Sequence, residues 1–180
     1  MKEISKIKYQ KSKISSGFTL VELILYIAIV SIFLTGVIMF TWDIIYGRVK
    51  SYVQEEVNQN LRYAAKRITY EIRNASAVNL PVTVTSISLA SGNAARNPTT
   101  IDISGGRLRI GYGNSGPCPI TSPCFLTSNK VDVTNLTFIN LSSGSDSINI
   151  KFSLTLGSVG QRREFQKSGT YESSVELRSH

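Results

Sequence analysis

The chain has few of the residues that carry enzymatic chemistry. Its 180 residues contain one histidine and two cysteines. The histidine is the terminal His180, so a serine or cysteine nucleophile has no general base in a fixed site. No glycine-rich phosphate loop opens a helix, and Asp102, Asp132 and Asp146 are scattered rather than spaced as metal ligands. We therefore expect no enzyme activity, no metal and no cofactor.

Charge is almost missing from one long segment. Between Phe18 and Trp42 the only charged residue is Glu22. As a helix this run is about 37 Å long, enough to cross a hydrocarbon core of ~30 Å. The alternative is a helix buried inside a soluble protein, which rarely reaches this length and apolar purity. We expect residues 18–42 to span a membrane.

The residues ahead of this segment are basic. The lysines are Lys2, Lys6, Lys8, Lys11 and Lys13, against the single acid Glu3. Lysine-rich flanks stay in the cytoplasm, so we expect a single-pass protein with its N-terminus inside and the bulk of the chain outside. A secretory signal peptide would have a shorter apolar core and a small-residue cleavage site, so we expect the span to be retained.

The two cysteines fit this orientation. Cys118 and Cys124 lie six residues apart in the proline-rich stretch GPCPITSPC. A disulfide is expected outside the cytoplasm and is rare within it. The alternatives are two free thiols or half of a metal site, although a zinc site would lack further ligands. We expect the disulfide.

A short motif joins the leader to the span. Gly17 is followed by FTLVE, which contains Phe18, Thr19, Leu20 and Glu22. With the basic leader and the apolar helix, this motif resembles the processing signal of type IV pilins and type II secretion pseudopilins. The resemblance implies that a prepilin peptidase cleaves after Gly17 on the cytoplasmic side and methylates the new amine of Phe18.

The resemblance also gives Glu22 a role. A carboxylate in a bilayer costs roughly 2.5–3.5 kcal/mol at mid-span and is usually paired. Cleavage creates a cationic amine at Phe18, and axially staggered subunits would bring the Glu22 of one beside the amine of another. We expect this pair to fix the register of the helices. The alternative is that Glu22 is a tolerated residue that reaches the membrane interface.

Helical periodicity continues beyond the span. Apolar residues recur at steps of three and four. They are Val49, Val53, Val57, Leu61, Ala64 or Ala65, Ile68, Ile72 and Ala75. We assign the charged residues between them, including Arg67 and Glu71, to the other faces. No proline precedes Pro81. One helix from about Phe18 to Ala75 is expected, and two helices hinged near Gly47 are the alternative.

After Pro81 the pattern changes to a period of two. The alternating stretches are VTVTSISL, TIDIS and RLRIGY around Gly105-Gly106, VDVTNLTFINL paired with SINIKFSLTL, and YESSVELR. The glycine pair permits a primed hairpin turn. Five to seven short strands predict an antiparallel sheet laid on the helix stripe. This α+β layout is the pilin fold that the resemblance also implies.

These assignments divide the chain into four segments. They are a basic leader (1–17), the membrane and assembly half of the helix (18–42), its amphipathic half (43–76) and an extracytoplasmic β-rich domain (77–180). The partners implied by the resemblance are prepilin peptidase, other pilin or pseudopilin subunits, an inner-membrane assembly platform and membrane lipid. The machine is a type IV pilus, a type II secretion pseudopilus or a competence pilus.

A second resemblance concerns position in a filament. LRYAAKRITYEIRNASAV and the C-terminal SSVELR are similar to the J-type minor pseudopilins, which sit near a filament's tip. Many major pilins have a helix-bending proline where this chain has Met39. Both features imply an initiating or tip subunit rather than a shaft subunit.

Two other functions stay open. Arg162, Arg163 and Lys167 cluster in the loop GSVGQRREFQKSGT, which on a filament could touch DNA phosphates or an anionic surface. Solvated charge is the commoner role of such a loop. The other alternative is a signal-anchored membrane protein with no part in assembly.

Overall fold

The computed structural model describes residues 17–142, 148–160 and 165–178, with the backbone alone at positions 80 and 81. The chain divides into two compact units, Met1–Ile45 and Tyr46–His180. Each unit is described by itself below.

One α-helix, α1 (Leu20–Asn74), contains parts of both units. The prediction of one helix is therefore confirmed to within two residues at each end. The alternative of two helices hinged near Gly47 is wrong, because Gly47 lies inside α1. The absence of proline before residue 81 explains this continuity, since every amide in the segment can donate to the ladder.

The apolar stripe of α1 is buried from Val57 onward. Its buried apolar residues are Val57, Leu61, Ala64, Ala65, Ile68 and Ile72. Val49 is exposed and Val53 is half-buried, so the stripe begins to pack about two turns later than the sequence predicts. Glu71 is also buried in α1, which contradicts its assignment to an outer face.

The second unit contains two antiparallel sheets rather than the single sheet that was expected. The larger has the order β1-β2-β3-β4-β5. Its strands are β1 (Ala77–Thr83), β2 (Ser86–Ala90), β3 (Thr99–Ser104), β4 (Arg107–Tyr112) and β5 (Cys124–Phe125). A short 3-10 helix, η1 (Ala94–Arg96), connects β2 to β3.

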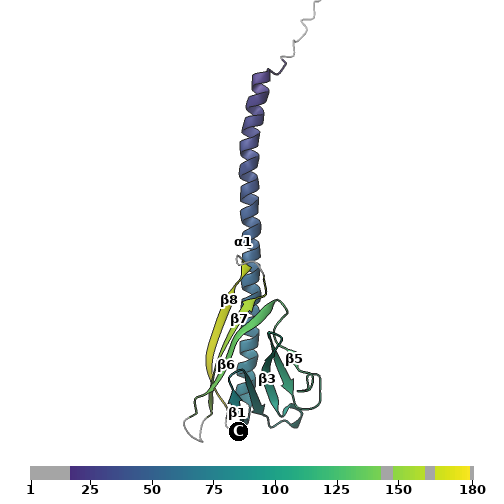
Figure 1. The fold of residues 1–180 in the computed structure, drawn as a ribbon, viewed down its shortest axis with the longest axis vertical. Coiled ribbons are helices and arrows are strands. Elements are labelled where there is room, and N and C mark those ends of the chain that lie inside the picture. The colour runs from purple at the N-terminus through teal and green to yellow at the C-terminus, as the bar shows by residue number, and fades with distance from the viewer. Residues whose placement is uncertain (1–16, 143–147, 161–164, 179–180) are drawn as a thin grey trace, which may run out of the picture. The chain divides into compact units, whose positions relative to one another are not determined.

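The smaller sheet has the order β6-β7-β8, and Figure 1 shows its three long strands side by side. They are β6 (Val131–Asn140), β7 (Asn149–Ser158) and β8 (Ser168–Glu176). β7 pairs with each neighbour over all but one of its residues. The predicted pairing of VDVTNLTFINL with SINIKFSLTL is thus confirmed.

Both sheets and the helix share one core. Residues of β2, β3 and β4 join those of β6 and β7 against the buried face of α1. The fully buried members of largest volume include Phe152, Ile68, Ile72, Ile87 and Ile101. The long helix packed on antiparallel sheets is the α+β, pilin-like arrangement that the sequence predicts.

Two hairpin turns contact the backbone of β6. The glycine pair turns with positive φ, 56° at Gly105 and 73° at Gly106, as a primed turn requires. The amide of Val133 donates to Gly106 O at 2.7 Å, and that of Phe138 donates to Val84 O at 3.1 Å. These bonds occupy part of the edge of β6, which a partner strand could otherwise use.

The stretch VTVTSISL departs from the expected alternating pattern. It contains the turn between β1 and β2, and Val84 in that turn is 64% exposed. β1 also begins at Ala77, four residues before the proline that seemed to start the strands. Proline is tolerated because β1 is an edge strand whose register with β2 shifts between Asn79 and Thr83.

Candidate functional site

α1 begins at the motif that the sequence singles out. The Thr19 carbonyl accepts the amide of Leu23 at 3.1 Å, and its hydroxyl accepts the amide of Glu22 at 3.3 Å. Thr19 is therefore the N-cap residue, and Thr-x-x-Glu has the sequence of a capping box. Gly17 and Phe18 precede the helix. Glu22 lies in the first turn, where the partial positive charge of the helix end favours a carboxylate.

The large apolar side chains that follow are almost all exposed. From Phe18 to Tyr46 the one exception is Val30, which is half-buried. Soluble proteins rarely expose contiguous apolar patches of more than a few hundred Å². α1 is also long and apolar enough to cross a membrane, and none of its most apolar stretch is buried within the protein. Lipid or other helices must therefore cover this surface.

Three serine and threonine hydroxyl groups of this segment donate hydrogen bonds within the helix. Ser31 donates to Ile27 O at 2.7 Å, Thr35 donates to Ser31 O at 2.8 Å, and Thr41 donates to Val37 O at 2.8 Å. In an apolar medium an unpaired hydroxyl would be costly. These bonds make the three hydroxyls compatible with a lipid or helix-bundle environment, in which Glu22 is the one charged side chain between Phe18 and Trp42.

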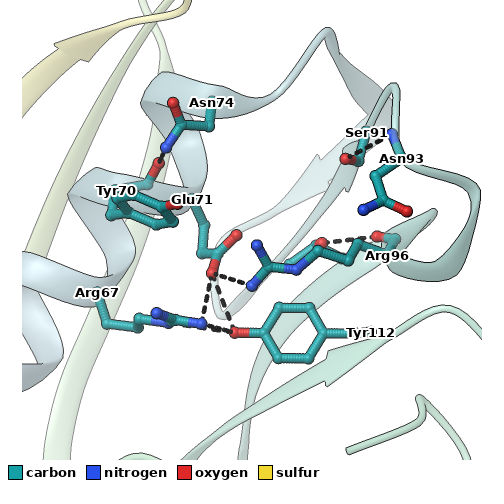
Figure 2. Close-up of polar contacts among 9 residues, drawn as sticks. Arg67, Tyr70, Glu71, Asn74, Ser91, Asn93, Arg96 and Tyr112 are labelled. Carbon is teal, nitrogen blue, oxygen red and sulfur yellow. Dashed lines mark hydrogen bonds and ion pairs between the residues drawn. The ribbon is translucent and has the colours of Figure 1, made fainter. Parts of the chain in front are cut away.

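A buried carboxylate lies near the other end of α1, in the second unit. Glu71 Oε1 is 3.0 Å from a guanidinium nitrogen of Arg67, 3.2 Å from one of Arg96, and 3.0 Å from the Tyr112 hydroxyl that donates to it. Arg67 also donates to the Tyr112 hydroxyl, as Figure 2 shows. We call these four residues the Glu71 cluster. It joins α1 to η1 and β4.

The Glu71 cluster raises the pKa of two of its members. Burial raises the pKa of the Tyr112 hydroxyl, and the charge and hydrogen bond of Glu71 raise it further against the opposing effect of Arg67. For Arg67, burial lowers the pKa, but the hydrogen bond to Tyr112 and the charge of Glu71 outweigh it and raise the pKa overall. The arrangement therefore favours a neutral tyrosine and a charged arginine.

The sequence contained a signal for this cluster. Glu71 follows Arg67 by four residues, the spacing of a helical ion pair, and stands three residues after the core residue Ile68. Those spacings place Glu71 at the border of the buried stripe. Its partners Arg96 and Tyr112 come from elements that periodicity cannot bring together.

A second polar contact holds the middle of the second unit together. Glu56 Oε1 accepts the Ser128 hydroxyl at 2.9 Å, and Asn60 Oδ1 accepts the Ser128 amide at 2.8 Å. Lys130 donates to the Tyr52 hydroxyl at 2.6 Å and lies 3.8 Å from Glu56. The hydrogen bond to Tyr52 and the charge of Glu56 raise the pKa of Lys130.

The predicted disulfide is confirmed. Cys118 and Cys124 are bonded, with Cα atoms 5.3 Å apart. The loop they close lies against β4, because the amide of Tyr112 donates to Cys118 O at 2.7 Å and β5 pairs Cys124 with Ile110. The disulfide loop therefore supports the strand that supplies Tyr112 to the Glu71 cluster.

Of the basic residues predicted in the binding loop, the structure describes only Lys167. Arg162 and Arg163 lie outside the described residues, as does Asp146. Lys167 is half-buried, and its backbone bonds to Ser158. Asp102 forms an ion pair with Arg109. Within residues 17–142, 148–160 and 165–178 no group of three or more His, Cys, Asp or Glu side chains could hold a metal ion.

Comparison with known proteins identifies the N-terminal motif. Residues 12–38 match the family model described as "Prokaryotic N-terminal methylation motif". No curated protein and no solved structure matches the chain.

The matched motif and the fold define a class. The chain combines a prepilin-type N-terminal signal with a pilin-like arrangement of a long apolar-then-amphipathic helix packed on antiparallel sheets. That signal is the one found in type IV pilins and pseudopilins, which are generally structural subunits rather than enzymes. It implies processing by a prepilin peptidase and assembly with other pilins.

Proposed function

We propose that this chain is a filament subunit that a prepilin peptidase cleaves after Gly17 and methylates on the amine of Phe18. The observation that carries the proposal is the exposed apolar helix directly behind the processing motif. A surface of this size has no stable free state in water, and lipid before assembly and neighbouring helices after it would cover it. Thr19 and Leu20 complete the peptidase recognition motif.

Glu22 provides the register contact between subunits. Each processed chain contributes one carboxylate at Glu22 and one amine at Phe18 to an otherwise uncharged segment. Charges in a low-dielectric bundle are costly unless paired, so the arrangement that joins each Glu22 to a neighbouring amine is strongly favoured over others. The position of Glu22 in the first turn supports this role, because it keeps the carboxylate near the end of the helix.

The other segments follow from this arrangement. Residues 1–17 are a cytoplasmic leader, 18–42 the membrane and assembly segment, 43–76 the spine of the folded domain, and 77–180 its extracytoplasmic β-rich part. The Cys118–Cys124 disulfide supports an oxidising compartment for that domain. The partners are the peptidase, an inner-membrane assembly platform, membrane lipid and other subunits.

We further propose an initiating or tip position for this subunit. The support is the likeness of residues 61–78 and of the C-terminal SSVELR to J-type minor pseudopilins, together with Met39 in place of a helix-bending proline. The machine would be a type IV pilus, a type II secretion pseudopilus or a competence pilus.

Replacement of Glu22 tests the assembly role. In the native host, Glu22→Ala and the isosteric Glu22→Gln should leave the protein in the membrane and cleaved after Gly17, but absent from sheared filaments. Mass spectrometry should find an N-methylated Phe18 in all variants. The control is Glu55→Gln, an exposed acid of the same helix, which should assemble normally. Full function of both Glu22 variants would favour a signal-anchored protein with no part in assembly.

A specific surface favours nucleic-acid binding as a second candidate function. Every exposed side chain of α1 from position 62 to position 73 is a cation or a tyrosine. They are Arg62, Tyr63, Lys66, Tyr70 and Arg73. The acid among them in sequence, Glu71, is buried and paired with two arginines. Cations interleaved with aromatic rings suit the phosphates and bases of a single strand.

The test compares this helix face with the basic loop of the sequence. The full chain in detergent would be titrated against a fluorescent single-stranded oligonucleotide at several salt concentrations. The helix-face role predicts that Arg62→Ala with Lys66→Ala and Arg73→Ala abolishes binding and its salt dependence. Arg48→Ala with Lys50→Ala is a control that removes two exposed positive charges from the same helix, against three in the test variant. Loss of binding only in Arg162→Ala with Arg163→Ala would move the site to the loop, and no binding by the wild type would end this candidate.

A further inference from the structure

The chain changes from non-helical to helical directly after the processing motif's glycine and aromatic residue. Gly17, Phe18 and Thr19 lie outside α1, which begins at Leu20. The start is defined by Thr19, whose carbonyl and hydroxyl both accept amides of the first turn.

Phe18 does not itself prevent the helix from extending past Thr19, whereas Gly17 disfavours extension by about 1 kcal/mol. An apolar environment favours continued helix, since an open amide there has no water to bond. Without the Thr19 hydroxyl, the Glu22 amide has no acceptor. Extension of the helix toward the leader, across the Gly17–Phe18 bond, would give this amide a backbone acceptor and so would be favoured. The Thr19 hydroxyl accepts the hydrogen bond of the Glu22 amide, so the helix can begin at Leu20 without this advantage of extension.

The bond ahead of the cap is open to approach. The Phe18 side chain is 77% exposed, and among the described residues no heavy atom beyond the chain neighbours of Gly17 lies within 4 Å of a Cβ placed on Gly17. Enzymes that cut or bind peptides commonly hold them extended, and a bond within a helix must first be locally unfolded. Because the Gly17–Phe18 bond lies outside the helix, a peptidase can bind it without first unfolding a helical turn.

We propose that Thr19 is a positioning residue for processing, which caps α1 and thereby keeps the Gly17–Phe18 bond outside the helix and available for hydrolysis. Water adds across that bond and leaves a carboxylate on Gly17 and an amine on Phe18. The inference rests on the proposed function. It differs from a role in which the peptidase reads the shape of Thr19 directly.

Two substitutions separate these roles. Thr19→Val keeps the branched shape and loses the hydroxyl, whereas Thr19→Ser keeps the hydroxyl and loses the methyl group. Full-length chains in vesicles would be incubated with purified prepilin peptidase, and initial cleavage rates followed by mass spectrometry. Hydrogen exchange of the Glu22 amide would report the cap independently of the peptidase.

Loss of an N-cap side chain typically changes the helix equilibrium about fivefold. We expect Thr19→Val to be cleaved about fivefold more slowly and to exchange its Glu22 amide faster, while Thr19→Ser stays within about twofold of the wild type in both. Cleavage of Thr19→Val at the wild-type rate would overturn the inference and leave the proposed function intact. Slow cleavage of both variants with unchanged exchange would assign Thr19 to direct recognition instead. An uncut wild-type chain would overturn the proposed function together with this inference.

Discussion

The hydroxyl of Tyr112 on β4 donates a hydrogen bond of 3.0 Å to the buried carboxylate of Glu71 on α1. The two residues are 41 positions apart, so the bond joins the end of the helix to the five-stranded sheet. The guanidinium groups of Arg67 and Arg96 form ion pairs with the same carboxylate. The Glu71 cluster therefore contributes to how the sheet is held against α1 within the second unit.

Removal of the Glu71 charge should destabilise this unit. Glu71→Gln keeps the side-chain volume but leaves two guanidinium groups without their anion. Arg67 and Arg96 are each about one third exposed, so water compensates part of the lost ion pairing. We expect the free energy of unfolding to fall by about 2 kcal/mol. Urea unfolding of the full chain in detergent measures it. The control Glu55→Gln, at an exposed position, should cost less than about 0.5 kcal/mol. Equal effects of the two changes would contradict the role of the cluster.

The pKa of Tyr112 predicts a dependence of stability on alkaline pH. Burial raises this pKa above its ordinary value, so the folded state favours the neutral phenol. An unfolded tyrosine ionises near pH 10, so this stability is fully present below about pH 10 and is lost as the pH rises through the raised pKa. Tyr112→Phe should be less stable at neutral pH, since three hydrogen bonds are lost, but should lose stability less steeply above pH 10.

The matched control for this experiment is Tyr63→Phe, which changes an exposed tyrosine of α1. Its unfolding free energy between pH 8 and 12 should follow the wild type. Lys130 also has a raised pKa and loses its contribution in the same direction, but it is present in both variants. If the unfolding free energy of Tyr112→Phe fell between pH 8 and 12 as steeply as that of the wild type, other groups would control alkaline unfolding.

Some features of the fold were visible in the sequence because they depend on local pattern. The period of α1 needs only neighbours three and four residues away, and the Gly105-Gly106 turn needs only residues without a side chain at positive φ. The Cys118–Cys124 pairing followed from the compartment that the span implies.

Other features depend on contacts that no local pattern encodes. The helical pattern alone predicts that Glu71 is a surface acid. Its burial depends on contacts with Tyr112 of β4 and Arg96 of η1. The division into two sheets depends on which strand edges meet, and alternation fixes only the face of each side chain. The capping role of Thr19 is missed for a different reason. The motif FTLVE predicts a recognition sequence, and the same Thr-x-x-Glu spacing is also the start signal of a helix.

A close backbone approach predicts the effect of one glycine substitution. A Cβ on Gly111 of β4 would lie 2.8 Å from Ile120 Cα and 3.1 Å from Thr100 Oγ1. Because the first of these atoms is backbone, the disulfide loop would have to move. Gly111→Ala should cost about 1–3 kcal/mol in the free energy of unfolding. Gly92→Ala is the control, since nothing lies within 4 Å of its added Cβ. Similar stability of the two variants would show that the loop is free to shift.

The disulfide should stabilise both the unit and the strand beside it. Cross-linking a loop as short as Cys118–Cys124 removes unfolded-state entropy worth about 2 kcal/mol. The double variant Cys118→Ser with Cys124→Ser should lose that amount of unfolding free energy. Reductant should lower the unfolding free energy of the wild type to the same value and leave that of the double variant unchanged. Hydrogen exchange should also accelerate at the Tyr112 amide, which donates to Cys118 O. Oxidised and reduced wild type of equal stability, with the Tyr112 amide protected alike in both, would mean that packing of the loop on β4 holds this strand without the bond.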